Sequence, residues 1–382
     1  MPPDMVRTID SRIFISTGEL SGEIHACHLV ESLRKRGTFH ITAMGSERLA
    51  AGGARIVRDY RDISVTGLSE VISHMGNIKR AFDTVKAHIR TERPDLVVLV
   101  DFPGFNMRIA RFARSLDIPV IYFIPPQVWA WKRSRLKKIK RYVDMVICIL
   151  PFEEELYARE GVPVVYIGHP FAATVRPSLD RDEFLANARV HGDRSILTVM
   201  PGSRRNEIRR HMPVLSEVIA IMRRSIPDLA VLLPLADNMD EAVVRPFLQG
   251  IGDVIILKQD SHNALAYCDA AIVASGSATL EAALLKAPTA IIYRISCLSY
   301  AIARLIVHVD FIGLPNIVAG KEVFPEFIQH LQPEIIARKA LSMIDKGRQD
   351  VAGELGIIVD KLKKQDSYPL AADTIIHFLE RL

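Results

Sequence analysis

Short apolar runs alternate with longer amphipathic runs along most of the chain. In the first half, apolar runs of strand-like length occupy residues 12–17, 40–45, 96–101, 119–124, 145–150 and 164–167. Amphipathic runs with helical spacing occupy residues 23–36, 107–116 and 152–159. Continuous apolar runs are typical of strands that are buried on both faces. Strands that alternate with helices predict a parallel sheet with helical crossovers.

The same alternation starts again after a linker at residues 170–181. Strand-like runs follow at residues 195–200, 229–234, 254–257, 270–274 and 289–293. A chain of 382 residues is long enough for two domains of ordinary size. We therefore expect an α/β fold of two Rossmann-like, doubly wound parallel-sheet domains, residues 1–172 and 173–359, that face a central cleft. The C-terminal helix, within residues 360–382, is expected to pack back on the first domain.

The most informative turn of the chain is Ser275-Gly276-Ser277, between an apolar run and an amphipathic run. Unpaired backbone N–H groups at Ser277, Ala278 and Thr279 would begin a helix there and favour a phosphate. Glu281 follows one turn later, where a carboxylate suits the hydroxyl groups of a sugar. Phosphate and ribose together indicate a nucleotide. A turn of small residues also forms for tight packing alone, and this alternative stays open.

A second candidate for phosphate binding is the segment Pro201-Gly202-Ser203-Arg204, which follows the first strand of the second half. It is expected at the carboxyl edge of the same sheet as the Ser275–Ser277 turn. Arg204 offers a rigid fork of donors for phosphate oxygens, with Ser203 beside it. An ordinary surface arginine is the alternative interpretation.

In the first half, two loops follow strands at the same expected sheet edge. Gly18-Glu19-Leu20-Ser21-Gly22 follows the first strand and opens a helix, so Glu19, Ser21 and Gly22 could meet a polar ligand. Asp101 and Asn106 lie in the loop after a central strand, where a catalytic carboxylate would be placed. An Asx turn or a helix cap is the alternative for Asp101. The chain lacks GxGxxG and GxxxxGK[ST], which argues against dinucleotide binding and P-loop chemistry.

Three further segments are candidates for contact with an acceptor or a membrane. The loop at residues 125–131 holds Gln127 and Trp129, and its tryptophans could stack on a sugar or line an acyl pocket, or pack between domains. The basic run at residues 132–141 suits anionic head groups, or is a solvated helix face. A helical pattern at residues 65–78 gathers apolar residues on one face, which would be core-facing or exposed to a membrane. The members proposed for membrane contact are Val65, Leu68, Ile72 and Met75.

Composition narrows the class of protein. Hydrophobic residues make up 49% and charged residues 24%, which excludes a disordered chain. A net charge of +5 suits an anionic ligand or membrane surface and is too small to indicate nucleic acid. The four cysteines lack zinc spacing, and Asp180-Arg181-Asp182 is interpreted as a helix cap, so no metal site is expected. We expect neither a secretory signal nor a spanning helix, and a cytoplasmic protein with reduced thiols.

Taken in order, these segments resemble the lipid-A-disaccharide synthase family, bacterial glycosyltransferases with the two-Rossmann-domain GT-B architecture. The resemblance covers nearly the whole chain and departs little from the family pattern; Leu20, for example, stands where the family often has alanine. The segments that carry it are GELSG (18–22), DFPGFN (101–106), PQVWAW (126–131), LPFE (150–153), GHP (168–170), PGSR (201–204), SGSATLE (275–281) and LPNIVAG (314–320).

The resemblance implies transfer of 2,3-diacylglucosamine from UDP to 2,3-diacylglucosamine 1-phosphate (lipid X), with inversion and without a metal or cofactor. It implies Asp101 as the base, Arg204 and the helix start at Ser277–Thr279 as the groups that neutralise UDP, and Glu281 as the ribose ligand. Asn316 would fix the donor, and Glu19, Ser21, Gly22, Asn106, Gln127 and Trp129 would line the acceptor side. The family is peripheral on the cytoplasmic face of the inner membrane, and a swapped homodimer is expected if the C-terminal helix crosses between chains.

Three other functions remain alternatives at this point. One is a UDP-N-acetylglucosamine 2-epimerase, which would release UDP without an acyl acceptor. A second is another UDP-sugar transferase with the same architecture. The third is a non-catalytic module that binds a nucleotide or a lipid, which would have no need of Asp101.

Overall fold

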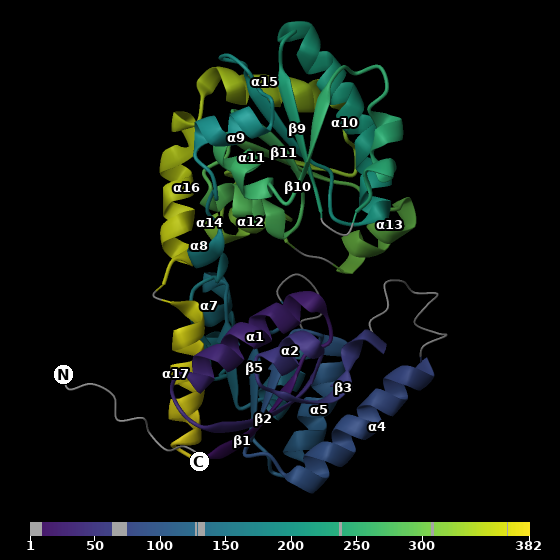
Figure 1. Ribbon diagram of the computed structural model, residues 1–382. Coiled ribbons are helices and arrows are strands. Elements are labelled where there is room, and N and C mark those ends of the chain that lie inside the picture. Colours follow the sequence, from purple (N-terminus) through teal and green to yellow (C-terminus); the bar gives the residue numbers. More distant parts are fainter. Residues whose placement is uncertain are drawn as a thin grey trace, which may run out of the picture. The chain divides into compact units, whose positions relative to one another are not determined.

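A computed structural model describes residues 10–62, 75–126, 128, 134–236, 239–306, 309–364 and 366–382. The chain forms two compact units, each with its own parallel sheet (Figure 1). The first unit comprises Met1–Pro170 together with Lys364–Leu382, and the second comprises Phe171–Lys363. The expected α/β class with two doubly wound parallel sheets is confirmed.

The first unit is built on a seven-stranded sheet with the order β3-β2-β1-β4-β5-β6-β7. The strand order reverses between β1 and β4, which pair in parallel from Ile13 with Leu96 to Ser16 with Leu99. Ligands of doubly wound sheets bind beyond the carboxyl ends of the strands at such a reversal. The strands are β1 (Ser11–Ser16), β2 (Phe39–Gly45), β3 (Arg55–Asp59), β4 (Leu96–Val100), β5 (Val120–Phe123), β6 (Met145–Cys148) and β7 (Val164–Tyr166).

Helices cover this sheet and bury the apolar faces of its strands. Side chains of β4 and β5, including Val97 and Tyr122, pack in one core with Ile109 of α5 and Ile139 of α6. The helices are α1 (Leu20–Arg34), α2 (Glu47–Ala51), α4 (Met75–Glu92), α5 (Pro103–Arg114), α6 (Ser134–Tyr142) and α7 (Pro151–Arg159), with a short 3-10 turn η1 (Tyr60–Asp62).

The last helix, α17 (Ser367–Leu379), packs against α1 in the first unit. His25 Nδ1 and the Tyr368 hydroxyl are hydrogen-bonded at 2.9 Å, and the ring of His28 stacks on Tyr368 with centroids 4.7 Å apart. Arg36 pairs with Asp373 at the other end of the contact. These contacts tie the carboxyl end of the chain to the helix that follows the Gly18–Gly22 loop.

The second unit has a six-stranded sheet with the order β10-β9-β8-β11-β12-β13. Its order reverses between β8 and β11, the strands that precede the Pro201–Arg204 and Ser275–Ser277 turns. The strands are β8 (Ile196–Met200), β9 (Ala230–Leu235), β10 (Val254–Lys258), β11 (Ala270–Ala274), β12 (Thr289–Tyr293) and β13 (Glu326–Ile328).

The helices of the second unit include two long ones, α10 and α15, that pack against each other over the sheet (Figure 1). The Asp180 side chain accepts a hydrogen bond of 2.9 Å from Glu183 N–H, which confirms its role as the cap of α9. No helix in the described ranges is long and apolar enough to cross a membrane. The helices are α8 (Phe171–Thr174), α9 (Arg181–Asn187), α10 (Arg205–Ser225), α11 (Ser261–Tyr267), α12 (Ser277–Leu284), α13 (Cys297–Ile306), α14 (Leu314–Ala319), α15 (Pro333–Lys346) and α16 (Gln349–Leu362), with 3-10 turns η2 (Glu241–Val243) and η3 (Arg245–Phe247).

Candidate active site

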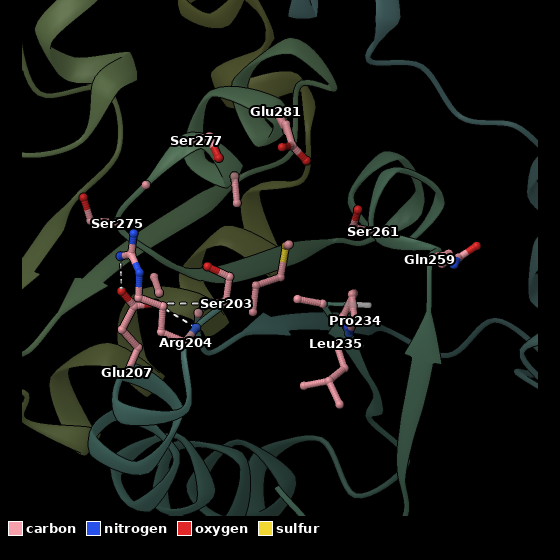
Figure 2. A pocket seen from close by; sticks show the side chains of 16 residues that line it. Ser203, Arg204, Glu207, Pro234, Leu235, Gln259, Ser261, Ser275, Ser277 and Glu281 are labelled. Carbon is pink, nitrogen blue, oxygen red and sulfur yellow. Dashed lines mark hydrogen bonds and ion pairs between the residues drawn. The ribbon is translucent and has the colours of Figure 1, made fainter. Parts of the chain in front are cut away.

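A cavity of about 620 Å³ opens where the strand order of the second sheet reverses (Figure 2). The turns after β8 and β11 form one part of its wall, and the end of β9 together with residues that follow β9 and β10 forms another. Seven of the residues expected to bind a UDP-sugar line it: Ser203, Arg204, Ser275, Gly276, Ser277, Ala278 and Glu281. Gly202, from the predicted Pro201–Arg204 segment, also lines it. The structure adds others that the sequence did not single out: Met200, Glu207, Pro234, Leu235, Ala236, Gln259, Ser261 and Ala274.

The start of α12 faces this cavity with no side chain capping it. Gly276 is the N-cap residue, and a Cβ atom added there would find no atom within 4 Å. Thr279 is buried, and its hydroxyl donates back to the Gly276 carbonyl at 2.7 Å, so it shapes the turn and does not line the cavity. Open space beside uncapped helix N–H groups is the arrangement that receives an anion.

Glu207 organises the other turn of the cavity. Its Oε2 accepts hydrogen bonds from the N–H groups of Ser203 and Arg204, and its Oε1 accepts one of 2.8 Å from the Arg204 guanidinium. Gly202 has a φ of +119°, and a Cβ atom there would lie 2.7 Å from Glu207 Oε2. The Arg204 side chain is 76% exposed, so it can turn from Glu207 toward an anionic ligand.

Buried His211 fixes the position of the same turn. The Pro201 carbonyl accepts a hydrogen bond of 2.7 Å from His211 Nδ1, and His211 Nε2 accepts one of 2.9 Å from Arg294 N–H. These partners require the neutral tautomer with the proton on Nδ1. Burial lowers the pKa of His211, which keeps the ring neutral. Nothing in the sequence indicates this role of His211, because its partners come from separate strand ends.

Glu281 is oriented by a histidine on the preceding helix. Its Oε2 lies 3.3 Å from Nε2 of His262 on α11. The hydrogen bond to Glu281 is the main cause that raises the pKa of His262, and the ring also bonds the backbone of Arg176. The Glu281 side chain therefore meets the cavity with a fixed direction, as a ligand for ribose hydroxyls requires.

Asn316 lies beneath the cavity wall and does not line it. It is fully buried, and its amide donates to the Phe324 carbonyl at 2.7 Å and to Glu326 Oε1 at 2.8 Å. Its carbonyl oxygen accepts from the N–H groups of Val323 and Phe324. Glu326 also accepts from the N–H groups at 312 and 313, and the Ile312 carbonyl accepts from the Ser275 hydroxyl. Hydrogen bonds through Glu326 and Ile312 thus link Asn316 to Ser275, which lines the cavity, and the hydrogen-bonding groups of Asn316 itself are occupied.

In the first unit, Asp101 and Glu19 form a pair of carboxyl groups at the reversal between β1 and β4. Burial is the main cause that raises the pKa of Asp101 to about 7, and the hydrogen bond and negative charge of Glu19 add to it. Asp101 and Phe102 both have a φ of +47°. A turn of left-handed, non-glycine residues is costly and is typical of functional sites.

Asn106 and Tyr122 hold this strained turn in place. Buried Asn106 donates to the carbonyls of Ser16, Val100 and Asp101, the last at 2.7 Å, and accepts from the Ser16 hydroxyl. The Tyr122 hydroxyl donates to the Asp101 carbonyl at 2.9 Å. Asn106 therefore positions Asp101 and does not itself face a ligand.

The Gly18–Gly22 loop packs directly on the Asp101 turn. A Cβ atom on Gly18 would overlap the Phe102 ring at 2.1 Å, and one on Gly22 would lie 3.5 Å from Asp101 Cβ. Glu19 and Ser21 are exposed beside this contact. Glycine at these positions lets the first loop approach the carboxylate.

Several expected site residues lie outside the described residues. These are Gln127, Trp129, Val65, Leu68 and Ile72, and the side chain of Met75, the first residue of α4, is also outside the description. Within the described part of the chain, no group of three or more His, Cys, Asp or Glu residues could hold a metal ion.

Known structures share the fold of this chain. In fold, the chain is similar to a putative UDP-N-acetylglucosamine 2-epimerase from Listeria monocytogenes (TM-score 0.62, 17% identity, 97% of each chain covered). It is likewise similar to the calicheamicin glycosyltransferase CalG4 (TM-score 0.60, 15% identity, 97% of this chain and 99% of that one covered). At these identities the likeness shows the fold alone.

Similarity in sequence is more specific. The chain is 41% identical over 327 residues to a lipid-A-disaccharide synthase of Geobacter sulfurreducens, with 85% of each protein covered. It is 34% identical over 367 residues to one of Coxiella burnetii, with 95% of this chain and 97% of the relative covered. A family model described as lipid-A-disaccharide synthetase matches residues 13–365. The chain therefore belongs to the lipid-A-disaccharide synthase family of glycosyltransferases.

Proposed function

We propose that this enzyme transfers 2,3-diacylglucosamine from UDP to the 6-hydroxyl of 2,3-diacylglucosamine 1-phosphate, giving a β(1→6)-linked disaccharide 1-phosphate and UDP. The observation that carries the proposal is the cavity of the second unit. There an uncapped helix start, an exposed arginine and an oriented glutamate line one space. Family membership supplies the acylated sugars as substrates.

The uridine diphosphate is assigned to this cavity. Its phosphates would accept hydrogen bonds from the N–H groups at Ser277 and Ala278 and from Arg204, and its ribose hydroxyls would donate to Glu281. A helix start and a guanidinium both stabilise negative charge, which grows on the diphosphate as it leaves. These fixed donors replace a metal ion in our proposal.

Asp101 is assigned as the base. It takes the proton of the acceptor 6-hydroxyl while that oxygen forms a bond to C1 of the donor sugar and the bond from C1 to the UDP oxygen breaks. A single displacement of this kind inverts the configuration at C1. A carboxyl group whose pKa is raised to about 7 is a stronger base than an ordinary aspartate and is still ionised in part at neutral pH. Glu19, Ser21 and Gly22 are assigned to the acceptor side.

The acylated substrates place the enzyme at a membrane surface. We propose peripheral association with the cytoplasmic face of the inner membrane through Val65, Leu68, Ile72 and Met75. Replacing Leu68, Ile72 and Met75 together by serine should release the protein from vesicles while circular dichroism stays unchanged; undiminished vesicle binding would reject the assignment. We also propose a homodimer, which equilibrium sedimentation tests.

The transfer is tested by UDP release from UDP-2,3-diacylglucosamine with and without the acceptor. Wild-type enzyme should release UDP only when the acceptor is present, and Asp101→Ala should abolish that release while it still binds UDP. Arg204→Ala should lower the rate on the order of 10²-fold. Release without acceptor would favour an epimerase, and tight UDP binding without any release would favour a binding module. Near-normal turnover by Arg204→Ala would remove it from the mechanism.

A further inference from the structure

A second cavity, of about 1,020 Å³, lies in the first unit along α5, between α4 and α6. Figure 1 shows α4 and α5 side by side below the sheet edge. We call it the basic groove, because five cationic side chains and no aspartate or glutamate are found among the described residues that line it. Those cations are Lys86, Arg108, Arg111, Arg135 and Lys138.

Within the described part of the chain, the charges of the basic groove have no acidic partners. None of the five cations forms an ion pair with a carboxylate among the residues that the structure describes. Arg114, on the same helix but outside the groove, does pair with Asp144 at 2.8 Å. Cations that converge without acidic partners repel one another, and an anion bound among them relieves that repulsion.

The groove also has an apolar part. Phe82, Met107, Phe112 and Tyr142 line it, and Lys86 lies over the Phe112 ring with Nζ 4.7 Å from the centroid. A surface that combines exposed cations with aromatic and thioether side chains suits a ligand with a negative head and a hydrocarbon tail. A fully polar anion such as a nucleotide would leave the apolar part unused.

The groove begins beside the proposed base. Pro103 and Gly104 line it, and they follow Asp101 by two and three residues. Arg135, from α6, acts electrostatically on Tyr122, whose hydroxyl donates to the Asp101 carbonyl. One end of the groove is therefore formed by the start of α5, which directly follows the Asp101 turn.

We propose that the basic groove binds the phosphate of the acceptor sugar, with part of an acyl chain against Phe82, Met107 and Phe112. This proposal rests on the proposed function, because it assigns the acceptor of that reaction. The acceptor carries a phosphate and hydrocarbon chains on one sugar, which are the two chemistries that the groove offers. The groove would thus select a phosphorylated acceptor and hold it with its 6-hydroxyl free to reach Asp101.

The test is the variant Arg108→Gln/Arg111→Gln, compared with Lys137→Gln/Lys140→Gln. The control pair is on α6 outside the groove lining and removes the same net charge. The groove variant should raise the acceptor KM at least about tenfold, since each charged hydrogen bond contributes on the order of tenfold in binding. The KM for the UDP-sugar should not change. A dephosphorylated diacylglucosamine, used as a competitor, should inhibit both variants equally.

Direct binding separates failure of this proposal from failure of the proposed function. Equilibrium dialysis with detergent-dispersed 2,3-diacylglucosamine 1-phosphate measures the affinity for the acceptor without turnover. If the enzyme fails to transfer the sugar but still binds this acceptor through the groove, the proposed function is wrong and the groove proposal is supported. Equal acceptor affinity in both variants would overturn the proposal. Loss of binding only to vesicles with anionic phospholipid would also overturn it, in favour of a membrane contact. Lys138→Gln gives the same readout if the double variant does not fold.

Discussion

His262 on α11 holds Glu281 on α12 through a contact of 3.3 Å between Nε2 and Oε2, and Glu281 lines the cavity assigned to UDP. The pair joins α11, which follows β10, to α12, which follows β11, although β9 and β8 lie between these two strands in the sheet. Its strength depends on the charge of His262, whose pKa is raised chiefly by its hydrogen bond to Glu281. The side chain that we assign to the ribose is thereby kept in one orientation.

Glu281→Gln should weaken UDP binding about tenfold, since a charged acceptor for the ribose is lost. His262→Gln should weaken it less, and the double variant should be little worse than Glu281→Gln, because His262 acts through Glu281. Isothermal titration calorimetry measures all three affinities. Additive losses would show that His262 contacts the nucleotide itself.

The His262–Glu281 pair also predicts a dependence on pH. Because the folded-state pKa of His262 is raised, its contribution to the free energy of unfolding is complete below about pH 6.5 and is lost as pH rises through the raised value. The stability difference between wild type and His262→Gln should therefore shrink as pH rises above neutrality. Urea denaturation at several pH values measures it, and a constant difference would contradict the pairing.

Glu19→Gln should shift the pH profile of the transfer. Glu19 raises the pKa of Asp101 through its hydrogen bond and its charge, so replacing it by an amide should lower that pKa below about 7. The base must be ionised, and the rising limb of kcat/KM should move to more acidic pH. The two carboxyl groups titrate as a coupled pair, so the limb reports the pair. Glu47→Gln, on exposed α2, is the control. An unmoved limb would argue against Asp101 as the base.

Gly276→Ala should weaken UDP binding without unfolding the protein. A methyl group there meets no protein atom within 4 Å and would project into the cavity where the phosphates are assigned. Gly202→Ala is the contrasting variant, because its φ of +119° and its contact with Glu207 make a side chain costly, on the order of 1–3 kcal/mol. Thermal unfolding and UDP titration of both variants separate the two effects. Unchanged UDP affinity in Gly276→Ala would place the nucleotide elsewhere.

Asn316→Ala should lower the free energy of unfolding by about 1–3 kcal/mol or more, because the N–H groups of Val323 and Phe324 lose their buried acceptor and the Phe324 carbonyl and Glu326 each lose a donor. The affinity for UDP should fall only slightly, because Asn316 affects the Ser275 turn indirectly, through Glu326 and Ile312. Denaturant titration beside UDP titration checks this. A variant with normal stability and lost UDP binding would instead show direct contact with the donor.

The periodicity of the sequence located most strands of both sheets, because a strand buried on both faces needs a continuous apolar run. Two strands were not predicted from this periodicity. β3 (Arg55–Asp59) is only half-buried and contains charged residues, and β13 (Glu326–Ile328) has three residues, too few for a pattern. The starts of α1 and α5 were placed three and four residues too late, because glycine, proline and polar residues there conceal the first turn.

Local sequence also identified the turns that line the cavity of the second unit. A turn of small residues after a strand, and an arginine in a second such turn, are both typical of phosphate binding. What only the tertiary structure decided is which side chains meet. Glu19 and Asp101 pair because β1 and β4 are neighbours across the reversal of strand order, although 82 residues separate them. Likewise, the tertiary structure buries Asn316 against Glu326. It also places His211 between the ends of two strands and gathers five cationic side chains along one groove. Spacing along a chain encodes secondary structure, whereas contact between distant residues depends on how the sheets order their strands.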